Sequence, residues 1–531
     1  MIENNLLLVL SLLFTITMLT MVSGKLKISY PIFLVVGGLL ISLIPGIPSI
    51  SLSPELVFLI FLPPLLYSAA WNTSWSDFWK NKRPISLLAF GLVIFTSAAI
   101  ALVSNLIIPD FPIAYGFLLG GIISPPDAIA ATSVLQGLKV PKRMVSILEG
   151  ESLINDASSL IVFRFALVAI LTGQFNLGNA SKEFFLVVVM GIVIGLVIAN
   201  IVYVIHRFFP TNPDIDTAIT LISPYIMYIT AEHFHYSGVL SVVCGGLFLS
   251  YRSQEIFSYE TRISAAGLWS TLTFLLNGFV FILIGLQLPG ILSELGNDSI
   301  AQAIGYAIII SLLTIIIRII WVFPGAYLPR ILFKSIREKE PRPTERVVFL
   351  VAWSGMRGVV SLASALAIPL TLNDGRNFPH RNLILFITFA VILVTLVLQG
   401  LSLKPLIKLL KVEANEETEK THDLDLRIQL AETVLTYMEI NYSEQSINHD
   451  AYKRVKERYE RMIEMTKRKL DSAEAQEEDN NFRKEYRQML IELVQVRRLA
   501  LKRYRYAKQF NEDLIREREW ELDLEEARLR N

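Results

Sequence analysis

Long apolar segments separated by short polar ones fill the first 411 residues of the chain. A transmembrane helix needs about 20 predominantly apolar residues, and segments of this kind recur along the sequence. We predict thirteen of them, at 5–24, 28–48, 54–72, 84–108, 113–136, 143–171, 183–206, 214–232, 236–251, 264–288, 299–329, 347–371 and 382–411. The pattern indicates an all-α polytopic membrane protein.

The charges between these segments predict their orientation. With the N-terminus outside, the inner loops hold 17 Lys and Arg residues and the outer loops hold 3. Positive residues are enriched in cytoplasmic loops, so we expect an odd number of spans in the cell membrane and a cytoplasmic C-terminus. The first segment follows Met-Ile-Glu-Asn-Asn, without a positive charge or a small-residue cleavage site, and is interpreted as a retained span.

The composition changes abruptly at Val412. Residues 412–531 carry 51 charged side chains, whereas the first 411 residues carry 46. We therefore predict a transmembrane domain at 1–411 and a charged helical cytoplasmic domain at 412–531. The tail segments 425–441, 450–475 and 481–508 show helical spacing of apolar residues. They are interpreted as a solvated extension that helps assembly, with a regulatory sensor as the alternative.

Several classes of protein are excluded by composition. The chain is 53% hydrophobic and 18% charged, whereas soluble proteins have about 25% charged residues. The chain is therefore too apolar to be an ordinary cytosolic enzyme. A net charge of +1 gives no reason to expect nucleic-acid binding. The single cysteine, Cys244, excludes an internal disulfide and a multi-cysteine metal site. No P-loop sequence is present, which argues against transport powered directly by ATP hydrolysis.

Few ionisable residues lie within the apolar segments, and the acids among them are clustered. The acids at membrane depth are Asp127, Glu149, Glu151 and Asp156. The basic residues at comparable depth are Arg164, Arg318 and Arg357. A charge at the bilayer centre costs about 2.5–3.5 kcal/mol even on the lenient insertion scale. Such a cluster indicates either a functional site or buried ion pairs that fix helix packing.

Two apolar segments contain residues that interrupt a helix. Ser124-Pro125-Pro126-Asp127 places two prolines in mid-span, which removes two backbone donors and blocks carbonyls one turn earlier. Freed carbonyls at membrane depth are tolerated only where protein or a water-filled cavity satisfies them. Ser354-Gly355-Met356-Arg357-Gly358 permits a second local unwinding. A carboxylate beside such carbonyls suits a small cation.

The sixth segment supplies the carboxylate of this predicted site. Ser152 and Asp156 are four residues apart and share one helix face. Together they form a cation site if a carbonyl or carboxylate approaches from the fifth segment. Glu151 requires a positive partner, for which Arg357 is the first choice. The competing partners are Arg164 and Arg318.

These elements resemble the signatures of the sodium/proton exchangers, the first family of monovalent cation:proton antiporters. The matching motifs, in the family's order, are Leu62-Pro63-Pro64-Leu65-Leu66-Tyr67, Pro126-Asp127-Ala128-Ile129-Ala130, Glu151-Ser152-Leu153-Ile154-Asn155-Asp156 and Gly355-Met356-Arg357-Gly358. The resemblance covers residues 1–411. It implies thirteen spans with two inverted six-helix repeats, two crossed unwound helices and a homodimer.

The resemblance also implies a role for each matched residue. Asp156 would carry either the proton or the cation, with Ser152 as the second ligand of the metal ion and the Pro126 carbonyl completing the coordination. Asn155 would be the family's asparagine, where electrogenic relatives have a second aspartate. Asp127 would be the acid of the unwound helix.

Glu151 and Arg357 would form a structural ion pair between spans. The sequence departs from the family in two places. Many members have Thr-Asp-Pro where this chain has Pro126-Asp127-Ala128, and many have an acid where it has Ser68.

The resulting hypothesis is an electroneutral one-for-one exchange of Na⁺, Li⁺ or K⁺ for H⁺, without a cofactor and without enzyme activity. Cation and proton would compete for Asp156, and the remaining partners would be the lipid bilayer and a second copy of the chain. A K⁺/H⁺ antiporter of the same fold is the alternative. A cation channel and a proton-coupled carrier of organic solutes are further alternatives, although the sequence shows neither a filter loop nor aromatic residues around the acids.

Overall fold

The computed structural model describes residues 2–26, 28–44, 59–135, 138–173, 177–295, 300–340, 342–372, 375–412, 416–442, 449–471, 473–507 and 512–530. The described chain is helical, apart from an isolated β-bridge between Thr371 and Asn377. It divides into two compact units, Met1–Ala414 and Asn415–Asn531.

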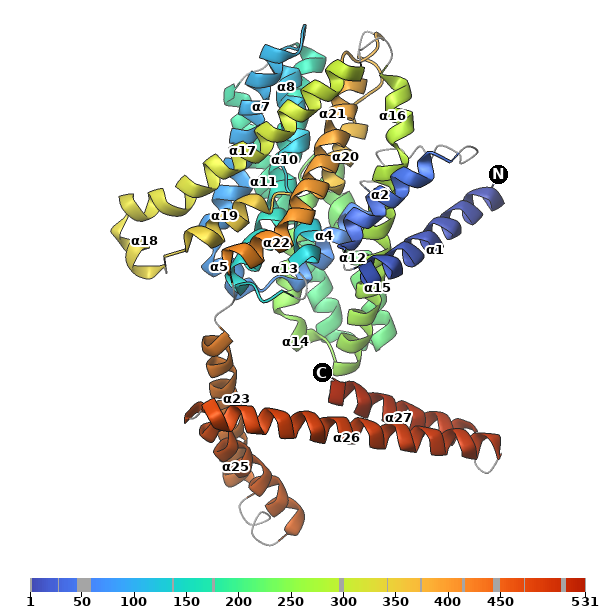
Figure 1. The fold of residues 1–531 in the computed structure, drawn as a ribbon, viewed down its shortest axis with the longest axis vertical. Helices are drawn as coiled ribbons and strands as arrows, with labels where there is room; N and C mark the ends of the chain where they lie inside the picture. The colour runs from blue at the N-terminus through green and yellow to red at the C-terminus, as the bar shows by residue number, and fades with distance from the viewer. Residues whose placement is uncertain are drawn as a thin grey trace. The chain divides into compact units, whose positions relative to one another are not determined.

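The first unit is a bundle of apolar helices (Figure 1). Its elements are α1 (Ile2–Leu26), α2 (Tyr30–Ser42), α4 (Leu62–Asn72), α5 (Trp75–Lys80), α6 (Lys82–Ser86), η1 (Leu87–Leu92), α7 (Val93–Ile107), α8 (Ile113–Ile123), α9 (Ala128–Leu135), α10 (Lys142–Thr172), α11 (Leu177–Phe208), α12 (Pro213–His233), α13 (Gly238–Tyr251), α14 (Ser253–Ile256), α15 (Tyr259–Leu286), α16 (Leu288–Glu294), α17 (Ile300–Leu332), α18 (Lys334–Lys339), α19 (Glu345–Trp353), α20 (Val359–Leu366), α21 (Arg381–Val394), η2 (Thr395–Gln399) and α22 (Gly400–Leu410). Every predicted apolar segment overlaps one or more of these helices. Among the described residues, 8 helices are long and apolar enough to cross a membrane. The parts of the second and third segments that fall at 45–58 lie outside the described residues.

Small residues allow neighbouring helices to approach closely. The backbone of α2 at Gly38 touches the carbonyl of Ile282 on α15, so a side chain at Gly38 would collide with it. Gly116 and Gly120 of α8 lie in the same way against α7. Without a hydrophobic driving force in lipid, such close backbone packing is a main source of helix association.

The two predicted helix interruptions are confirmed. The segment 113–136 forms α8 and α9 with non-helical residues 124–127 between them, and 347–371 forms α19 and α20 around non-helical residues 354–358. The structure also contains two π-helical turns, η1 and η2, which the sequence analysis did not predict. Carbonyls of η1 are used by other helices, because Trp321 Nε1 donates to the Leu87 carbonyl at 3.0 Å.

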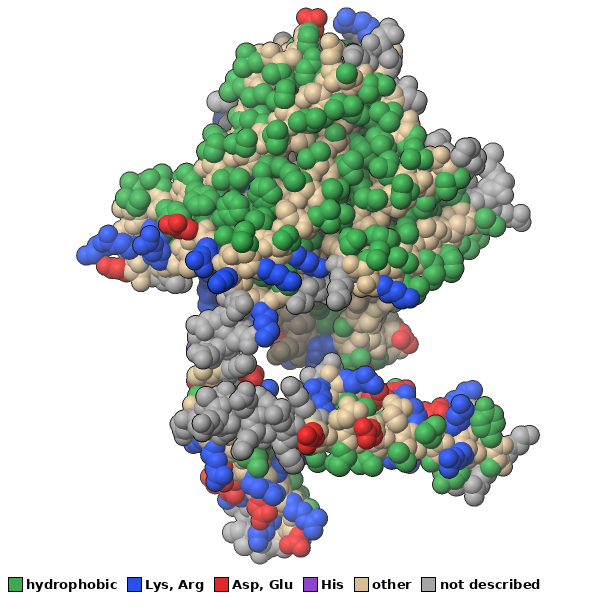
Figure 2. Space-filling view, viewed as in Figure 1, with side chains coloured by type: hydrophobic (Ala, Val, Ile, Leu, Met, Phe, Trp, Pro, Cys, Tyr) green, Lys and Arg blue, Asp and Glu red, His purple; other side chains and the backbone are tan. Residues whose placement is uncertain are grey.

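The surface of the first unit suits a membrane. Figure 2 shows one face covered by hydrophobic side chains, with Lys and Arg gathered toward one end. That end contains the basic loops around α5, α6, α14 and α18, which the charge analysis places on the inner side. We call it the basic edge.

The second unit consists of α23 (Glu416–Asn441), α25 (Asp450–Asp471), α26 (Ala473–Tyr506) and α27 (Glu512–Arg530). The predicted helical segments of the tail correspond to α23, α25 and α26, whereas α27 was not predicted. Figure 1 shows α26 and α27 side by side. Ion pairs join them, including Arg497 to Glu525 at 2.5 Å and Arg505 to Glu519 at 2.7 Å. Their exposure makes each pair a small contribution to stability.

Candidate functional site: a cavity at two interrupted helices

The first interruption is organised by the carboxylate that follows the two prolines. Helix α8 ends at Ile123, and α9 begins directly after Asp127. Asp127 Oδ1 accepts hydrogen bonds from the backbone N–H groups of Ile129 at 2.8 Å and Ala130 at 3.4 Å. Asp127 therefore caps the N-terminus of α9, where a negative charge is also favoured by the helix dipole.

The second interruption crosses the first. The backbone N–H of Asp127 donates to the carbonyl of Met356 at 2.6 Å, which joins the two unwound segments. A Cβ atom at Gly358 would collide with the Asp127 carboxylate. Glycine is required at this position because the second segment passes directly against that side chain. The predicted crossing of two unwound helices is thus present in the structure.

Arg357 supplies donors to the broken end of α8. Its side chain is fully buried, and Nε donates to the Ile123 carbonyl at 3.0 Å while Nη2 donates to the Ser124 carbonyl at 3.4 Å. Its Nη1 also donates to the carbonyl of Gly355. The arginine therefore satisfies carbonyls that the interruption frees, and its positive charge lies at the C-terminal end of α8.

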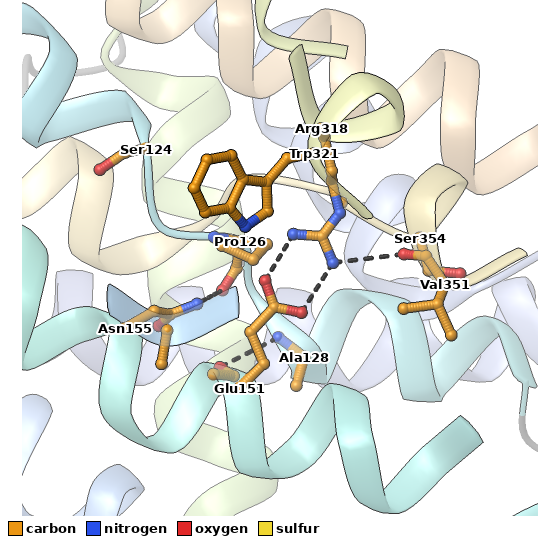
Figure 3. A network of polar contacts seen from close by, with 12 residues as sticks. Ser124, Pro126, Ala128, Glu151, Asn155, Arg318, Trp321, Val351 and Ser354 are labelled. Atoms are coloured by element: carbon orange, nitrogen blue, oxygen red, sulfur yellow. Dashed lines mark hydrogen bonds and ion pairs between the residues drawn. The ribbon is translucent and has the colours of Figure 1, made fainter. Parts of the chain in front are cut away.

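The prediction that Glu151 pairs with Arg357 is wrong. Glu151 instead forms a two-pronged ion pair with Arg318 of α17, at 2.5 Å and 2.7 Å, with both side chains buried (Figure 3). Arg357 is held by the freed carbonyls, whereas Arg318 comes from an uninterrupted helix and reaches the acid directly. The third alternative, Arg164, pairs with Glu232 in a partly exposed position.

Helix α10 holds the first unwound segment through two side chains. Asn155 Nδ2 donates to the Pro126 carbonyl at 3.2 Å (Figure 3), and Ser152 Oγ accepts from the backbone N–H of Ala128 at 3.2 Å. The structure therefore brings Ser152, Asn155, Pro126 and Asp127 together. The contacts show Asn155 as a support of the backbone, a role that the sequence analysis did not foresee.

Asp156 faces a cavity of about 290 Å³. Helix α10 presents Glu149, Ser152 and Asp156 to this cavity, and Asp127 contributes from the unwound segment. The side chain of Asp156 is 8% exposed. Its carboxylate accepts no hydrogen bond within the described residues, so its charge is open to a mobile partner. The same stretch of chain contains no group of three or more His, Cys, Asp or Glu side chains that could hold a resident metal ion.

Asp156 has no hydrogen-bond partner for its carboxylate, unlike the other buried acids of the described chain. Those acids are Glu151 and Asp216. Glu151 is paired with Arg318, and Asp216 accepts from Thr261 Oγ1 at 3.1 Å and lies 2.7 Å from His206 Nδ1. A buried carboxylate without a partner carries a large desolvation penalty. That penalty is relieved when a cation or a proton neutralises the group.

Helices α4 and α15 form another wall of the cavity. This wall contains Ser68, which the sequence already marked as a departure from the family, and Thr273 and Asn277, which the sequence did not reveal. Asn277 is 4% exposed, and its Oδ1 has no hydrogen-bond partner among the described residues. An amide in the middle of an otherwise apolar span is the sequence signal that could have identified it.

A second cavity, of about 570 Å³, continues from this wall toward the basic edge. The two cavities share Ser68, Asn72, Thr273 and Asn277. The second cavity also reaches Ser253 in α14 and Arg262 in the first turn of α15. Polar side chains thus connect the carboxylate with the end of the bundle at which the basic loops lie.

Interrupted helices that cross beside carboxylates, within an apolar helical bundle, are typical of secondary transporters. Residues 9–409 match the family described as "Sodium/hydrogen exchanger, transmembrane". The chain belongs to the sodium/hydrogen exchanger family.

Two relatives show how far the similarity extends. The chain is 33% identical over 435 residues to the sodium, potassium, lithium and rubidium/H⁺ antiporter of Bacillus pumilus. This alignment covers 80% of this chain and 63% of that relative. This chain thus spans less than two thirds of that protein. It is 30% identical over 520 residues to an uncharacterized Na⁺/H⁺ exchanger of Mycobacterium bovis, covering 96% of this chain and 93% of the relative.

The fold is also similar to a solved structure. The sodium proton antiporter MjNhaP1 from Methanocaldococcus jannaschii superimposes with a TM-score of 0.61 at 19% sequence identity. The similarity covers 75% of this chain and 99% of that structure. At this level of identity the similarity shows a shared fold.

Proposed function

We propose that this chain exchanges Na⁺, Li⁺ or K⁺ for H⁺ in a one-for-one, electroneutral cycle, with both ions competing for Asp156. The observation that carries the proposal is the state of this carboxylate. It is buried, it faces a cavity, and it accepts no hydrogen bond from the described residues.

Neutralisation of the carboxylate explains the coupling. A bound cation and a bound proton each remove the charge of Asp156, so that either loaded form can pass through the low-dielectric part of the bundle. The bare carboxylate resists this passage because of its desolvation penalty. One shared site therefore gives exchange without a separate gate, while one helical bundle moves against the other.

The contacts of the neighbouring residues support the one-for-one stoichiometry. Asn155 carries no charge and holds the Pro126 carbonyl at 3.2 Å. Asp127 is engaged as the cap of α9. Asp156 then remains as the carrier, with Ser152 as the ligand one turn away. The Pro126 carbonyl is the third proposed ligand, since a carbonyl oxygen has a second lone pair.

The choice among monovalent cations is the second point to test. The Bacillus pumilus relative is described as an antiporter of sodium, potassium, lithium and rubidium, so a K⁺/H⁺ exchanger is the competing function. The chain lacks an acid at Ser68, which lines the cavity opposite Asp156. With fewer carboxylates around the ion, we expect weak discrimination between Na⁺ and K⁺.

The proposed assembly rests on the loop charges for its orientation and on the family resemblance for its repeats and its dimer. We place thirteen spans in the cell membrane, arranged as inverted six-helix repeats, with the N-terminus outside and the charged tail of 412–531 in the cytoplasm. We also propose a homodimer. The distribution of Lys and Arg between the loops supports this orientation.

The function is tested by reconstituting the full chain in sealed vesicles with a pH-sensitive dye. We expect Na⁺, Li⁺ or K⁺ added outside to move protons in the wild type and not in Asp156→Asn. The matched control is Glu183→Gln, which removes an exposed acid from α11 and should transport normally. Net charge movement under a clamped potential would exclude the electroneutral cycle, and full activity of Asp156→Asn would exclude the carrier role.

A further inference from the structure

The cavity at Asp156 contains a second acid that the proposed exchange cycle does not use. Glu149 lies on α10 two helical turns before Asp156, and both side chains line the same cavity. Two turns correspond to about 10 Å along the helix axis. Glu149 is half-buried, and its carboxylate has no hydrogen bond or ion pair with any other described residue. This carboxylate therefore has no structural partner that explains it.

Glu149 lies between Asp156 and the basic edge. A Cβ atom at the next residue, Gly150, would lie 3.3 Å from the side chain of Phe78, so this part of α10 packs against α5 at the basic edge. The cavity also reaches Asn72, an exposed residue at the end of α4 directly before α5. An ion that enters the cavity from the basic edge would therefore pass Glu149 before it reaches Asp156.

The charges that line this cavity have one sign. Its ionisable residues are Asp127, Glu149 and Asp156, and no Lys, Arg or His belongs to the described part of its lining. The second cavity, which also reaches the basic edge, is lined by Arg262 and by no described acid. A cleft lined by one sign of charge raises the local concentration of counter-ions. The route past Glu149 thus favours a cation, whereas the route past Arg262 opposes one.

We propose that Glu149 is the loading residue for the transported cation. Its carboxylate attracts a monovalent cation from the water at the basic edge, and the cation then moves on to Asp156. This inference rests on the exchange proposed for Asp156 and adds a residue that acts on one side of the membrane. A cation that arrives from the opposite face reaches Asp156 without passing Glu149, so its binding should not depend on this residue.

Two other roles of Glu149 predict different results. A purely structural carboxylate would affect the amount of folded protein or the maximal rate, and it would not change the cation affinity on one face alone. A charge that acts on Asp156 from a distance would change the affinity on both faces equally, because the two residues stay on one helix. Only a loading role predicts a change of affinity that is confined to the basic edge.

The test measures the half-saturating Na⁺ concentration on each face, with a pH-sensitive dye, in inside-out and right-side-out vesicles from cells that lack other Na⁺/H⁺ antiporters. The measurement is made at alkaline pH, at which protons compete least for the shared site. Glu149→Gln should raise this concentration about fivefold at the basic edge and less than about twofold on the other face. Glu149→Asp keeps the charge and should stay within about twofold of the wild type. Glu260→Gln is the matched control, because Glu260 is an exposed acid in the first turn of α15 that lines neither cavity.

Three outcomes would overturn the loading role. An unchanged Na⁺ affinity of Glu149→Gln at the basic edge would remove the residue from the entry path. An equal change on both faces would show that its charge acts on Asp156 from a distance. A loss in Glu149→Asp as large as that in Glu149→Gln would show that the charge is not the cause. A wild type that moves no protons in response to Na⁺, Li⁺ or K⁺ would instead refute the exchange itself, so the two failures are distinguishable.

Discussion

The ion pair between Glu151 and Arg318 makes a prediction about the stability of the bundle. Both side chains are buried, and two hydrogen bonds at 2.5 Å and 2.7 Å join them. Arg318 Nη2 also donates to the Val351 carbonyl at 3.3 Å. A side chain at Gly355 would collide with Arg318, so the pair lies directly against the second interruption. The pair therefore links α10, α17 and the end of α19.

Arg318→Met should remove all three hydrogen bonds and leave the Glu151 carboxylate buried without a partner. Breaking a buried pair in this way costs about 3–5 kcal/mol. Replacing both members, in Glu151→Leu with Arg318→Met, should restore most of that loss, because no uncompensated charge remains. The double variant is expected to lie within about 1 kcal/mol of the wild type.

The measurement is reversible unfolding of the full chain in mixed micelles of a mild detergent and sodium dodecyl sulfate, followed by tryptophan fluorescence. Arg164→Met is the matched control. Arg164 lies on α10, the helix that carries Glu151, and its partly exposed ion pair with Glu232 should contribute under about 1 kcal/mol to stability. If Arg318→Met loses no more stability than Arg164→Met, the buried pair does not hold the bundle together and the reasoning fails.

The remaining predictions concern the crossing and the cavity. Gly358→Ala forces a methyl group against the Asp127 carboxylate, so we expect aggregation in size-exclusion chromatography and no transport. A monodisperse and active variant would contradict the close contact between the two unwound segments. Asn155→Asp cannot donate to the adjacent carbonyl when ionised, and vesicle transport should fall at least about tenfold. Asn277→Leu should weaken the apparent Na⁺ affinity without abolishing exchange, and an unchanged affinity would remove Asn277 from the cation path. Apparent Na⁺ affinity should weaken by about tenfold for each unit of pH over the range in which Asp156 binds protons, whereas a pH-independent affinity would rule out a shared site.

Local chemistry explains why the helix interruptions could be predicted from the sequence. Consecutive prolines block helical hydrogen bonding wherever they lie, and the glycines at 355 and 358 permit a local unwinding. The matching of Ser152 and Asp156 to one face required only helical spacing, and both residues do line the same cavity. These features depend on neighbouring residues in the chain, so the sequence contains the information.

The partner of Glu151 could not be predicted in this way. Arg318 is 167 residues away in sequence, and Arg357 offers the same charge at a similar depth. The choice depends on which arginine is already engaged, and Arg357 is held by the Ile123 and Ser124 carbonyls. The sequence reveals the number of buried charges, but not that carbonyls freed by the interruption compete with Glu151 for the donors of an arginine. The same limitation hid Asn277, whose position on the cavity wall depends on how α15 packs.

The polar groups of the crossing explain why one acid is left available. Freed carbonyls at Ile123 and Ser124 are satisfied by Arg357, and the carbonyl of Pro126 is held by Asn155. Asp127 is fixed as a helix cap, so its charge is balanced by backbone N–H groups. The polar groups exposed by the interrupted helices are thus satisfied by nearby donors and acceptors. None of these donors makes a hydrogen bond to Asp156. A transporter requires this arrangement, because a carboxylate satisfied by the protein would have no reason to exchange one ion for another.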